Sequence, residues 1–276
     1  MNQIFWVAGG GFPRLLAVLC WAPDWAPALL RAALPVIAAQ GLRRGVGGGE
    51  KAKRGTALPA VTGALVIAAV YFSGEHYADS PAGTVLRWLI AAAVLALLLA
   101  SVLTYGRPGA LVLQDVCVMA VAGLVIPWAF SCMLQLRMLP HGAGMVLMPL
   151  VAAFCSDSAA LFTGMACGRH KMAPLVSPHK TVEGALGGIA GGVVGMVIFR
   201  IVFYFCTLVP LHIGWCVVIG LAGALMGELG DLSFSVIKRQ VGIKDYGRLL
   251  PGHGGVLDPV GSVLFAAPMI LMNGCT

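Results

Sequence analysis

The stretch Gly227–Ser262 reads GELGDLSFSVIKRQVGIKDYGRLLPGHGGVLDPVGS and concentrates charge in a chain that is otherwise apolar enough to lie in lipid. It holds seven charged residues between Asp231 and Asp258, together with His253. Over all 276 residues, 59% are hydrophobic and only 11% are charged, and the mean hydropathy is +0.91. An ordinary soluble domain has about 25% charged residues. The chain is therefore predicted to be a polytopic membrane protein, in which such a charged stretch needs a functional reason.

The apolar runs of the chain are long enough to cross a bilayer as helices of about 20 residues. Because helices satisfy their backbone hydrogen bonds internally, we predict an all-α fold, a polytopic transmembrane helical bundle of about 8–9 spans. We expect one integral-membrane domain, 1–276, with N-terminal spans in 1–134 and the site-bearing C-terminal spans in 143–276. Two short spans are assigned to the proline-broken residues 4–40. The remaining runs lie near 57–73, 85–103, 110–134, 143–164, 184–206, 214–235 and 256–272.

Basic loops indicate which side of the membrane is cytoplasmic. The loop 42–55 carries five Lys or Arg residues, whereas 74–84 carries two acids and neither Lys nor Arg. Alternation from these two loops puts the later basic loops, 165–183 and 236–255, on the cytoplasmic face of the membrane. The net charge of +7 follows from this bias, so no nucleic-acid partner is predicted. No cleaved signal peptide is expected.

Small residues in the C-terminal half predict close helix packing rather than a ligand site. Glycines recur between 184 and 195 and again between 220 and 230, at spacings that let helix backbones approach. The eight cysteines are scattered singly in apolar surroundings without a CxxC pair, so they are interpreted as buried small side chains and not as a metal cluster.

A polar face is predicted on the helix that ends near Arg239. Glu228, Asp231, Ser235 and Lys238 follow one another at steps of three, four and three, which aligns them on one side of a helix. Acidic side chains within a membrane helix are costly unless they face a wet cavity or a partner charge, and they therefore mark candidate sites. The structural alternative is an ion pair of Asp231 with Lys238 or Arg239.

The loop that follows this helix has the side chains of a phosphate site. Basic side chains suit phosphate oxygens, a pair of glycines allows close backbone approach, and carboxylates suit Mg²⁺. These are the components of metal-dependent phosphoryl or nucleotidyl transfer. The residues are Lys244, Asp245, Arg248, His253, Gly254, Gly255 and Asp258.

A second polar constellation precedes it, between Ser156 and Gly184. Asp157 lies within an apolar run, Thr181 is placed to cap the following helix, and Glu183 in its first turn would favour the helix dipole. His170 and His179 are interpreted as exposed loop histidines.

Five spaced motifs run in order through the second half of the chain. They are Ser156-Asp157-Ser158, Gly168-x-His170-Lys171-x-Ala173-Pro174, Ser177-Pro178-x-Lys180-Thr181-x-Glu183-Gly184, Ser235-x-x-Lys238-Arg239-x-x-x-x-Lys244-Asp245 and Leu250-Pro251-Gly252-His253-Gly254-Gly255-x-x-Asp258. Together they closely resemble the signature of the bacterial phosphatidate cytidylyltransferase (CDP-diacylglycerol synthase) family. The hydropathy of the first half fits the multi-helix membrane fold of that family.

The resemblance implies a reaction of phosphatidic acid with CTP that gives CDP-diacylglycerol and pyrophosphate for phospholipid biosynthesis. It implies Mg²⁺ as cofactor, held by Asp231 and Asp258, and is compatible with a second cation and with a homodimer. The implied catalytic residues are Ser235, Lys238, Arg239, Lys244, Asp245 and His253. The implied substrate-binding residues are Asp157, Lys171, Ser177, Lys180, Thr181, Glu183, Gly254 and Gly255.

The chain departs from the family pattern beside two of these motifs. After Asp258 the family usually continues Arg-x-Asp-Ser, whereas this chain has Pro259, Val260, Gly261 and Ser262, and Phe234 stands where a polar or acidic residue is common. A divergent, low-activity or noncatalytic family member is therefore one alternative. A CTP-dependent lipid kinase, which would release CDP, is a second. A transporter or channel that uses the intramembrane acids as an ion path is a third.

Overall fold

The computed structural model describes residues 61, 63–68, 81–106, 110, 112–241 and 257–274. These residues form helices almost throughout, with a single pair of short strands among them. The chain divides into two compact units, one comprising Met1–Met138 and Val241–Asp258 and the other Leu139–Gln240 and Pro259–Thr276. Each unit is described by itself.

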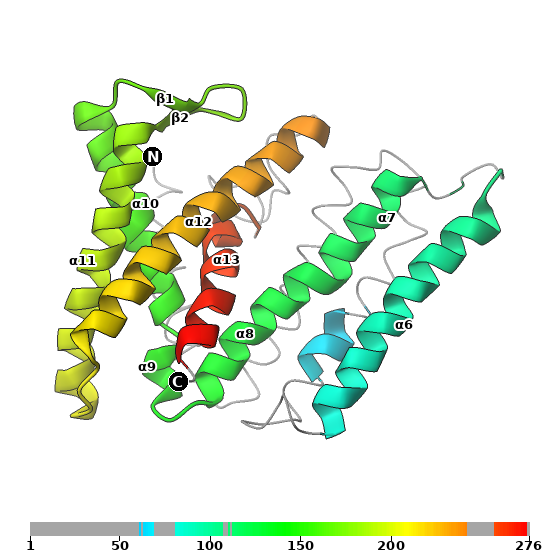
Figure 1. Cartoon of the computed structure of the whole chain (residues 1–276), viewed down its shortest axis with the longest axis horizontal. Coiled ribbons are helices and arrows are strands. Elements are labelled where there is room, and N and C mark those ends of the chain that lie inside the picture. The colour runs from blue at the N-terminus through cyan, green and yellow to red at the C-terminus, as the bar shows by residue number, and fades with distance from the viewer. Residues whose placement is uncertain are drawn as a thin grey trace, which may run out of the picture. The chain divides into compact units, whose positions relative to one another are not determined.

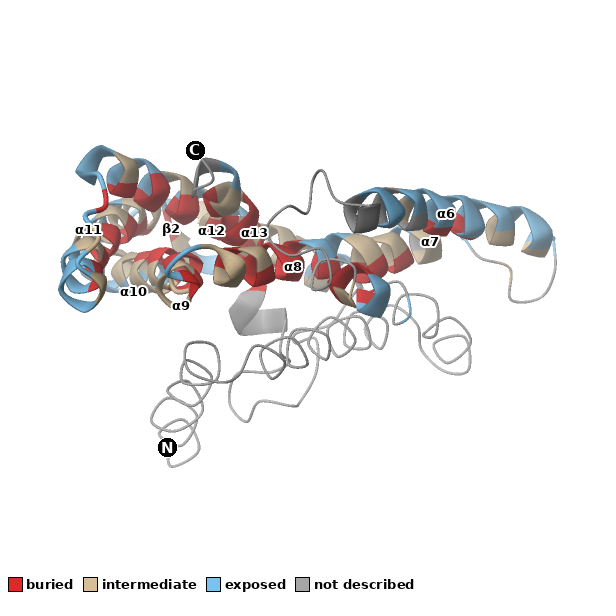
Figure 2. Cartoon of the chain, turned by 90° about the horizontal axis from the view of Figure 1, so that it is seen from below, coloured by how far each residue is buried: buried red, intermediate tan, exposed pale blue. Residues whose placement is uncertain are grey.

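Among the residues of the first unit that the structure describes, two long segments are apolar helix. α6 covers Pro81–Thr104, and most of its ribbon has the colour of exposed residues in Figure 2. Its exposed apolar side chains include Trp88, Leu95 and Val102. The second segment runs through α7 (Leu113–Ala120), the π-helical turn η3 (Val121–Val125) and α8 (Ile126–Met138). Pro127 cannot donate to the preceding turn, and the wider turn η3 directly before it accommodates the proline within one continuous helix.

The second unit holds the helices that carry the predicted site (Figure 1). α10 and α11 are joined by a short β-hairpin, and α12 and α13 complete the unit in Figure 1. Its elements are α9 (Gly142–Met145), α10 (Met148–Cys167), β1 (Lys171–Ala173), β2 (Ser177–Thr181), α11 (Val182–Thr207), α12 (Ile213–Val241) and, from Pro259 on, α13 (Leu257–Gly274).

Glycines let the backbones of this unit approach closely, as the sequence predicted. Gly184, Gly188 and Gly192 recur every fourth residue on α11 and are buried. A Cβ built at Gly184 would lie 2.9 Å from the carbonyl oxygen of Ala160 on α10, and one at Gly192 would lie 2.8 Å from the Cβ of Ala224 on α12. These positions have no room for a side chain, so the small residues are required by packing.

The core of the second unit also includes α13. Leu264, Ala266, Ala267 and Ile270 are buried on this helix. The approach of α12 to α13 is close as well, because a Cβ at Gly230 would lie 2.8 Å from the carbonyl oxygen of Gly261.

Four helical segments among the described residues are long and apolar enough to cross a membrane. They are Asp115–Met138, Gly142–Cys167, Val182–Thr207 and Ile213–Gln240, and they coincide with four of the predicted runs. The described residues are therefore consistent with the predicted all-α membrane fold. The total of 8–9 spans and the single domain stay predictions, because most of the region before Pro81 lies outside the described residues. The strands β1 and β2 were not predicted.

Candidate active site

The β-hairpin between α10 and α11 positions the second polar constellation. β1 and β2 pair antiparallel, with Lys171 opposite Thr181 and Ala173 opposite Ser177 (Figure 1). Thr181 is the N-cap of α11, and its hydroxyl accepts a hydrogen bond from the backbone N–H of Gly184 at 3.1 Å. The cap satisfies one of the free donors at the start of α11 and fixes the point at which β2 becomes helix.

Lys180 of β2 joins the hairpin to the polar face of α12. Its Nζ lies 2.8 Å from Oε1 of Glu228 and 2.8 Å from Oδ2 of Asp231. The three side chains are only 21%, 17% and 35% exposed, respectively. Asp231 therefore pairs with a lysine 51 residues earlier in the chain.

The two carboxylates keep Lys180 charged. Burial acts to lower the pKa of this ammonium group, but attraction to Asp231 and Glu228, together with their hydrogen bonds, outweighs burial, and the net shift raises the pKa above its ordinary value. Lys180 is thus a fixed positive charge at neutral pH.

Asp157 of α10 belongs to the same electrostatic cluster. The charges of Asp231, Lys180 and Glu228 act on its carboxyl group, and Ser262 of α13 lies near it. Residues of α10, β2, α12 and α13 are therefore close together here. The sequence placed Asp157, Lys180 and Asp231 in the site but left Glu228 and Ser262 out of it. Glu228 could have been included from its position three residues before Asp231 on the same helical face.

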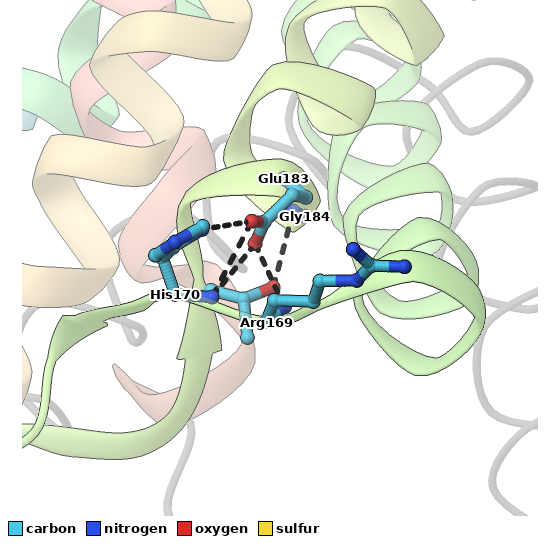
Figure 3. Close-up of polar contacts among 5 residues, drawn as sticks. Arg169, His170, Glu183 and Gly184 are labelled. Carbon is cyan, nitrogen blue, oxygen red and sulfur yellow. Dashed lines mark hydrogen bonds and ion pairs between the residues drawn. The ribbon is translucent and has the colours of Figure 1, made fainter.

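The two ends of the hairpin are fixed by other candidate residues. Glu183, at the start of α11, accepts hydrogen bonds from the backbone N–H groups of Arg169 and His170, and its Oε1 lies 2.6 Å from Nδ1 of His170 (Figure 3). At the turn, Nε of Arg239 on α12 donates to the carbonyl oxygen of Val176 at 3.1 Å. The side chain of His170 is 79% exposed, as the sequence predicted, and it also has a carboxylate partner.

The other candidates fall into two groups. Ser235 and Lys238 are half-buried on α12, Ser177 is half-buried on β2, and Lys171 is exposed on β1. Asp258 lies in the first turn of α13, but its side chain is not among those that the structure describes. Five candidates, Lys244, Asp245, His253, Gly254 and Gly255, lie outside the described residues.

The cluster contains carboxyl groups, the type of donor that binds hard divalent cations. Asp157, Glu228 and Asp231 supply three carboxyl groups against the single ammonium of Lys180, and carboxylate oxygens are the protein ligands that Mg²⁺ prefers. Within the described ranges, no three His, Cys, Asp or Glu side chains are close enough together to hold a metal ion. The donor types are those that Mg²⁺ prefers, but the described side chains do not by themselves form a metal site.

Comparison with known proteins identifies the family of the chain. The model of the cytidylyltransferase family matches residues 4–274. The chain belongs to this family. The match covers both polar constellations and the apolar N-terminal region.

Curated relatives are similar over about half of the chain. A phosphatidate cytidylyltransferase of Bacillus subtilis (strain 168) is 34% identical over 158 residues, 57% of each chain. One of Brucella suis biovar 1 (strain 1330) is 39% identical over 136 residues, 49% of this chain and 48% of the relative. The uncharacterized protein YnbB of Escherichia coli (strain K12) is 38% identical over 141 residues, 51% and 46% of the two chains. The matched segments thus span about half the length of these relatives.

Proposed function

We propose that this chain is a phosphatidate cytidylyltransferase, which transfers CMP from CTP to phosphatidic acid and releases pyrophosphate. The observation that carries the proposal is the contact of Lys180 with Glu228 and Asp231 beside Asp157, because it joins two of the family-like motifs to the polar face of α12 at one point. The names of the relatives from Bacillus subtilis and Brucella suis support the same substrates.

The proposed reaction is a substitution at the α-phosphorus of CTP. An oxygen of the lipid phosphate forms a bond to that phosphorus, and the bond from it to the oxygen that bridges to the β-phosphorus breaks, so that pyrophosphate carries the leaving electron pair. The lipid phosphate is already nucleophilic, so no strong general base is required. Lys180, held as a cation by its carboxylate partners, would offset negative charge that shifts toward the pyrophosphate.

Mg²⁺ is the proposed cofactor, with Asp231 and Asp258 as its ligands. When bound, the ion would polarise the phosphate oxygens as a Lewis acid. Ser235, Lys238 and Arg239 would line the same end of α12, and Lys244, Asp245 and His253 would approach from the following loop.

The proposed location is the cytoplasmic face of a bacterial inner membrane. Four helices long and apolar enough to span support a membrane setting. The basic residues in 165–183 and 236–255 support the cytoplasmic orientation of the site. Lipid would enter sideways from the bilayer, and CTP would enter from the cytoplasm.

The test uses the purified full-length protein in liposomes that contain phosphatidic acid. Labelled CTP and Mg²⁺ are added, and labelled lipid and pyrophosphate are measured. The proposal expects both products in equal amounts. Release of CDP without pyrophosphate would identify the lipid-kinase alternative, and binding of CTP without turnover would identify a noncatalytic member. Labelled lipid no greater than in liposomes without the protein would overturn the assignment.

A further inference from the structure

The carboxylate of Glu183 makes its hydrogen bonds within the chain. Oε2 accepts from the backbone N–H of Arg169 at 3.1 Å and from that of His170 at 3.2 Å, and Oε1 lies 2.6 Å from Nδ1 of His170 (Figure 3). A carboxylate offers about four acceptor sites, so three of them are used by one short segment of backbone and side chain. This geometry is typical of a residue that fixes a loop.

The segment that Glu183 holds is the base of the β-hairpin. The backbone N–H of Val182 donates to the carbonyl oxygen of His170 at 2.9 Å, directly beside these contacts. Lys171 then pairs with Thr181 in the strand register. Glu183 therefore stabilises the point at which the chain leaves α10 and returns to enter α11.

The register at this base determines where Lys180 points. Successive side chains of a strand point to opposite sides, and a slip by one residue reverses them. In the observed register Thr181 is buried and caps α11, while Lys180 reaches Glu228 and Asp231. Loss of the register would direct Lys180 away from α12.

We propose that Glu183, together with His170, is a positioning residue that fixes the base of the hairpin so that Lys180 reaches the carboxylates of α12. The sequence had assigned Glu183 to substrate binding. The effect on turnover rests on the proposed function, whereas the effect on the hairpin does not.

The first experiment measures amide hydrogen exchange in the purified full-length protein in detergent. Glu183→Ala is expected to raise the exchange rates of the Arg169, His170 and Val182 amides by about 10-fold, because hydrogen bonds to a charged acceptor are lost. Glu183→Gln keeps one acceptor oxygen and should raise them less. The control is His179→Ala, an exposed residue of the same hairpin, which should leave these rates unchanged. Unchanged exchange in Glu183→Ala would overturn the proposal.

The second experiment is a double-mutant cycle on turnover with Lys180. Glu183→Ala alone should lower kcat by about 10-fold, but by less than about 2-fold when Lys180→Ala is already present, because both changes remove the same contact. Independent losses that multiply would indicate direct substrate binding by Glu183 and overturn the proposal. His170→Asn, which keeps a donor near the position of Nδ1, should retain more activity than His170→Ala.

The two experiments distinguish a failure of the proposed function from a failure of the positioning role of Glu183. If the wild-type protein makes no labelled lipid, the proposed function fails, and hydrogen exchange alone decides the positioning role. If turnover is present but the exchange rates do not change in Glu183→Ala, the positioning role fails and the proposed function stands.

Discussion

Two contacts of the second unit hold α11 and α12 in place by opposite means. Along α11, Gly184, Gly188 and Gly192 bring its backbone against α10 and α12 by the absence of side chains. At the hairpin, Lys180 reaches α12 through a long charged side chain that meets two carboxylates. The first contact is sensitive to added volume, and the second is sensitive to lost charge.

The difference shows which parts of the unit form a scaffold and which can react. A packed glycine contact is rigid and has no group that can change its charge or its partner. An ion pair that is partly exposed can be rearranged by a phosphate or a cation, because its energy depends strongly on nearby charges. We therefore expect volume changes to alter stability and charge changes to alter catalysis.

The largest effect is expected from Asp231→Asn, which tests the charged contact. Loss of this carboxylate removes one partner of Lys180 and one proposed Mg²⁺ ligand. Turnover of labelled CTP into lipid should fall by about 100-fold, or about 2.7 kcal/mol of activation free energy.

The matched control for this change is Ser233→Ala. Ser233 lies two residues away on α12, and its hydroxyl donates to the carbonyl oxygen of Leu229 within the same helix. Its turnover should match that of the wild-type protein. Full activity in Asp231→Asn would show that Asp231 is not a required Mg²⁺ ligand.

The next effect is expected from Gly192→Ala, which tests the contact that depends on the absence of side chains. The added methyl group would lie 2.8 Å from the Cβ of Ala224 and 3.0 Å from the carbonyl oxygen of Gly220, so the helices must separate. The free energy of unfolding should fall by about 2 kcal/mol, measured by thermal or denaturant unfolding in detergent.

Gly214→Ala is the control, because its nearest atoms belong to the movable side chain of His212. This variant should be as stable as the wild-type protein or slightly more stable, since alanine favours helix over glycine. Equal losses at both positions would show that the loss at Gly192 does not arise from its close contact with Ala224, because helix propensity alone predicts a gain at both positions.

A smaller effect is expected from Lys180→Met, which removes the charge but keeps most of the side-chain length. Turnover should fall by about 10-fold, or about 1.4 kcal/mol, while Lys180→Arg should retain more activity. Because the pKa of Lys180 is raised, the stability that the ion pair contributes is fully present below the ordinary lysine value of 10.5. It is lost only as the pH rises through the higher folded value, so the difference in stability between wild type and Lys180→Met should be constant from pH 8 to pH 9, a range below that value in which the neighbouring carboxyl groups are ionised.

The sequence predicted the spans and the glycine packing because both are encoded locally. Apolar length determines whether a helix can cross a bilayer, and the spacing of Gly184, Gly188 and Gly192 is visible in the chain itself. The same local logic placed Glu228 and Asp231 on one face of a helix. These features need no knowledge of the partner element.

The contacts of the hairpin could not be predicted in the same way. Lys180 and Glu228 are 48 residues apart in the chain, and nothing in the spacing of either motif indicates their contact. The strands themselves are short, and Pro174 and Pro178 are residues that disfavour a strand prediction. The roles of Glu183 and Arg239 depend on backbone groups of this hairpin, so they became visible only once its path was known.

The smallest effect is expected at Phe234 and Gly261, where the ring of Phe234 occupies the space that a charged side chain at position 261 would need. A Cβ at Gly261 would lie 2.9 Å from Cδ2 of Phe234, and the buried Phe234 ring packs edge-on against Phe265 with their centroids 6.1 Å apart. The family-like change Gly261→Asp therefore requires that Phe234 moves. We expect Gly261→Asp alone to lower the free energy of unfolding and Phe234→Ser to be destabilising as well, through the cavity it leaves.

The double variant should be more stable than the sum of the two losses by about 1 kcal/mol, because the serine frees the space that the aspartate needs. Unfolding of the four proteins of this cycle in detergent provides the measurement. Simple addition of the two losses would show that the ring of Phe234 and residue 261 do not compete for space. A positive coupling would explain why an apolar ring and a glycine occur together here: the volume that a carboxylate would occupy is filled by Phe234.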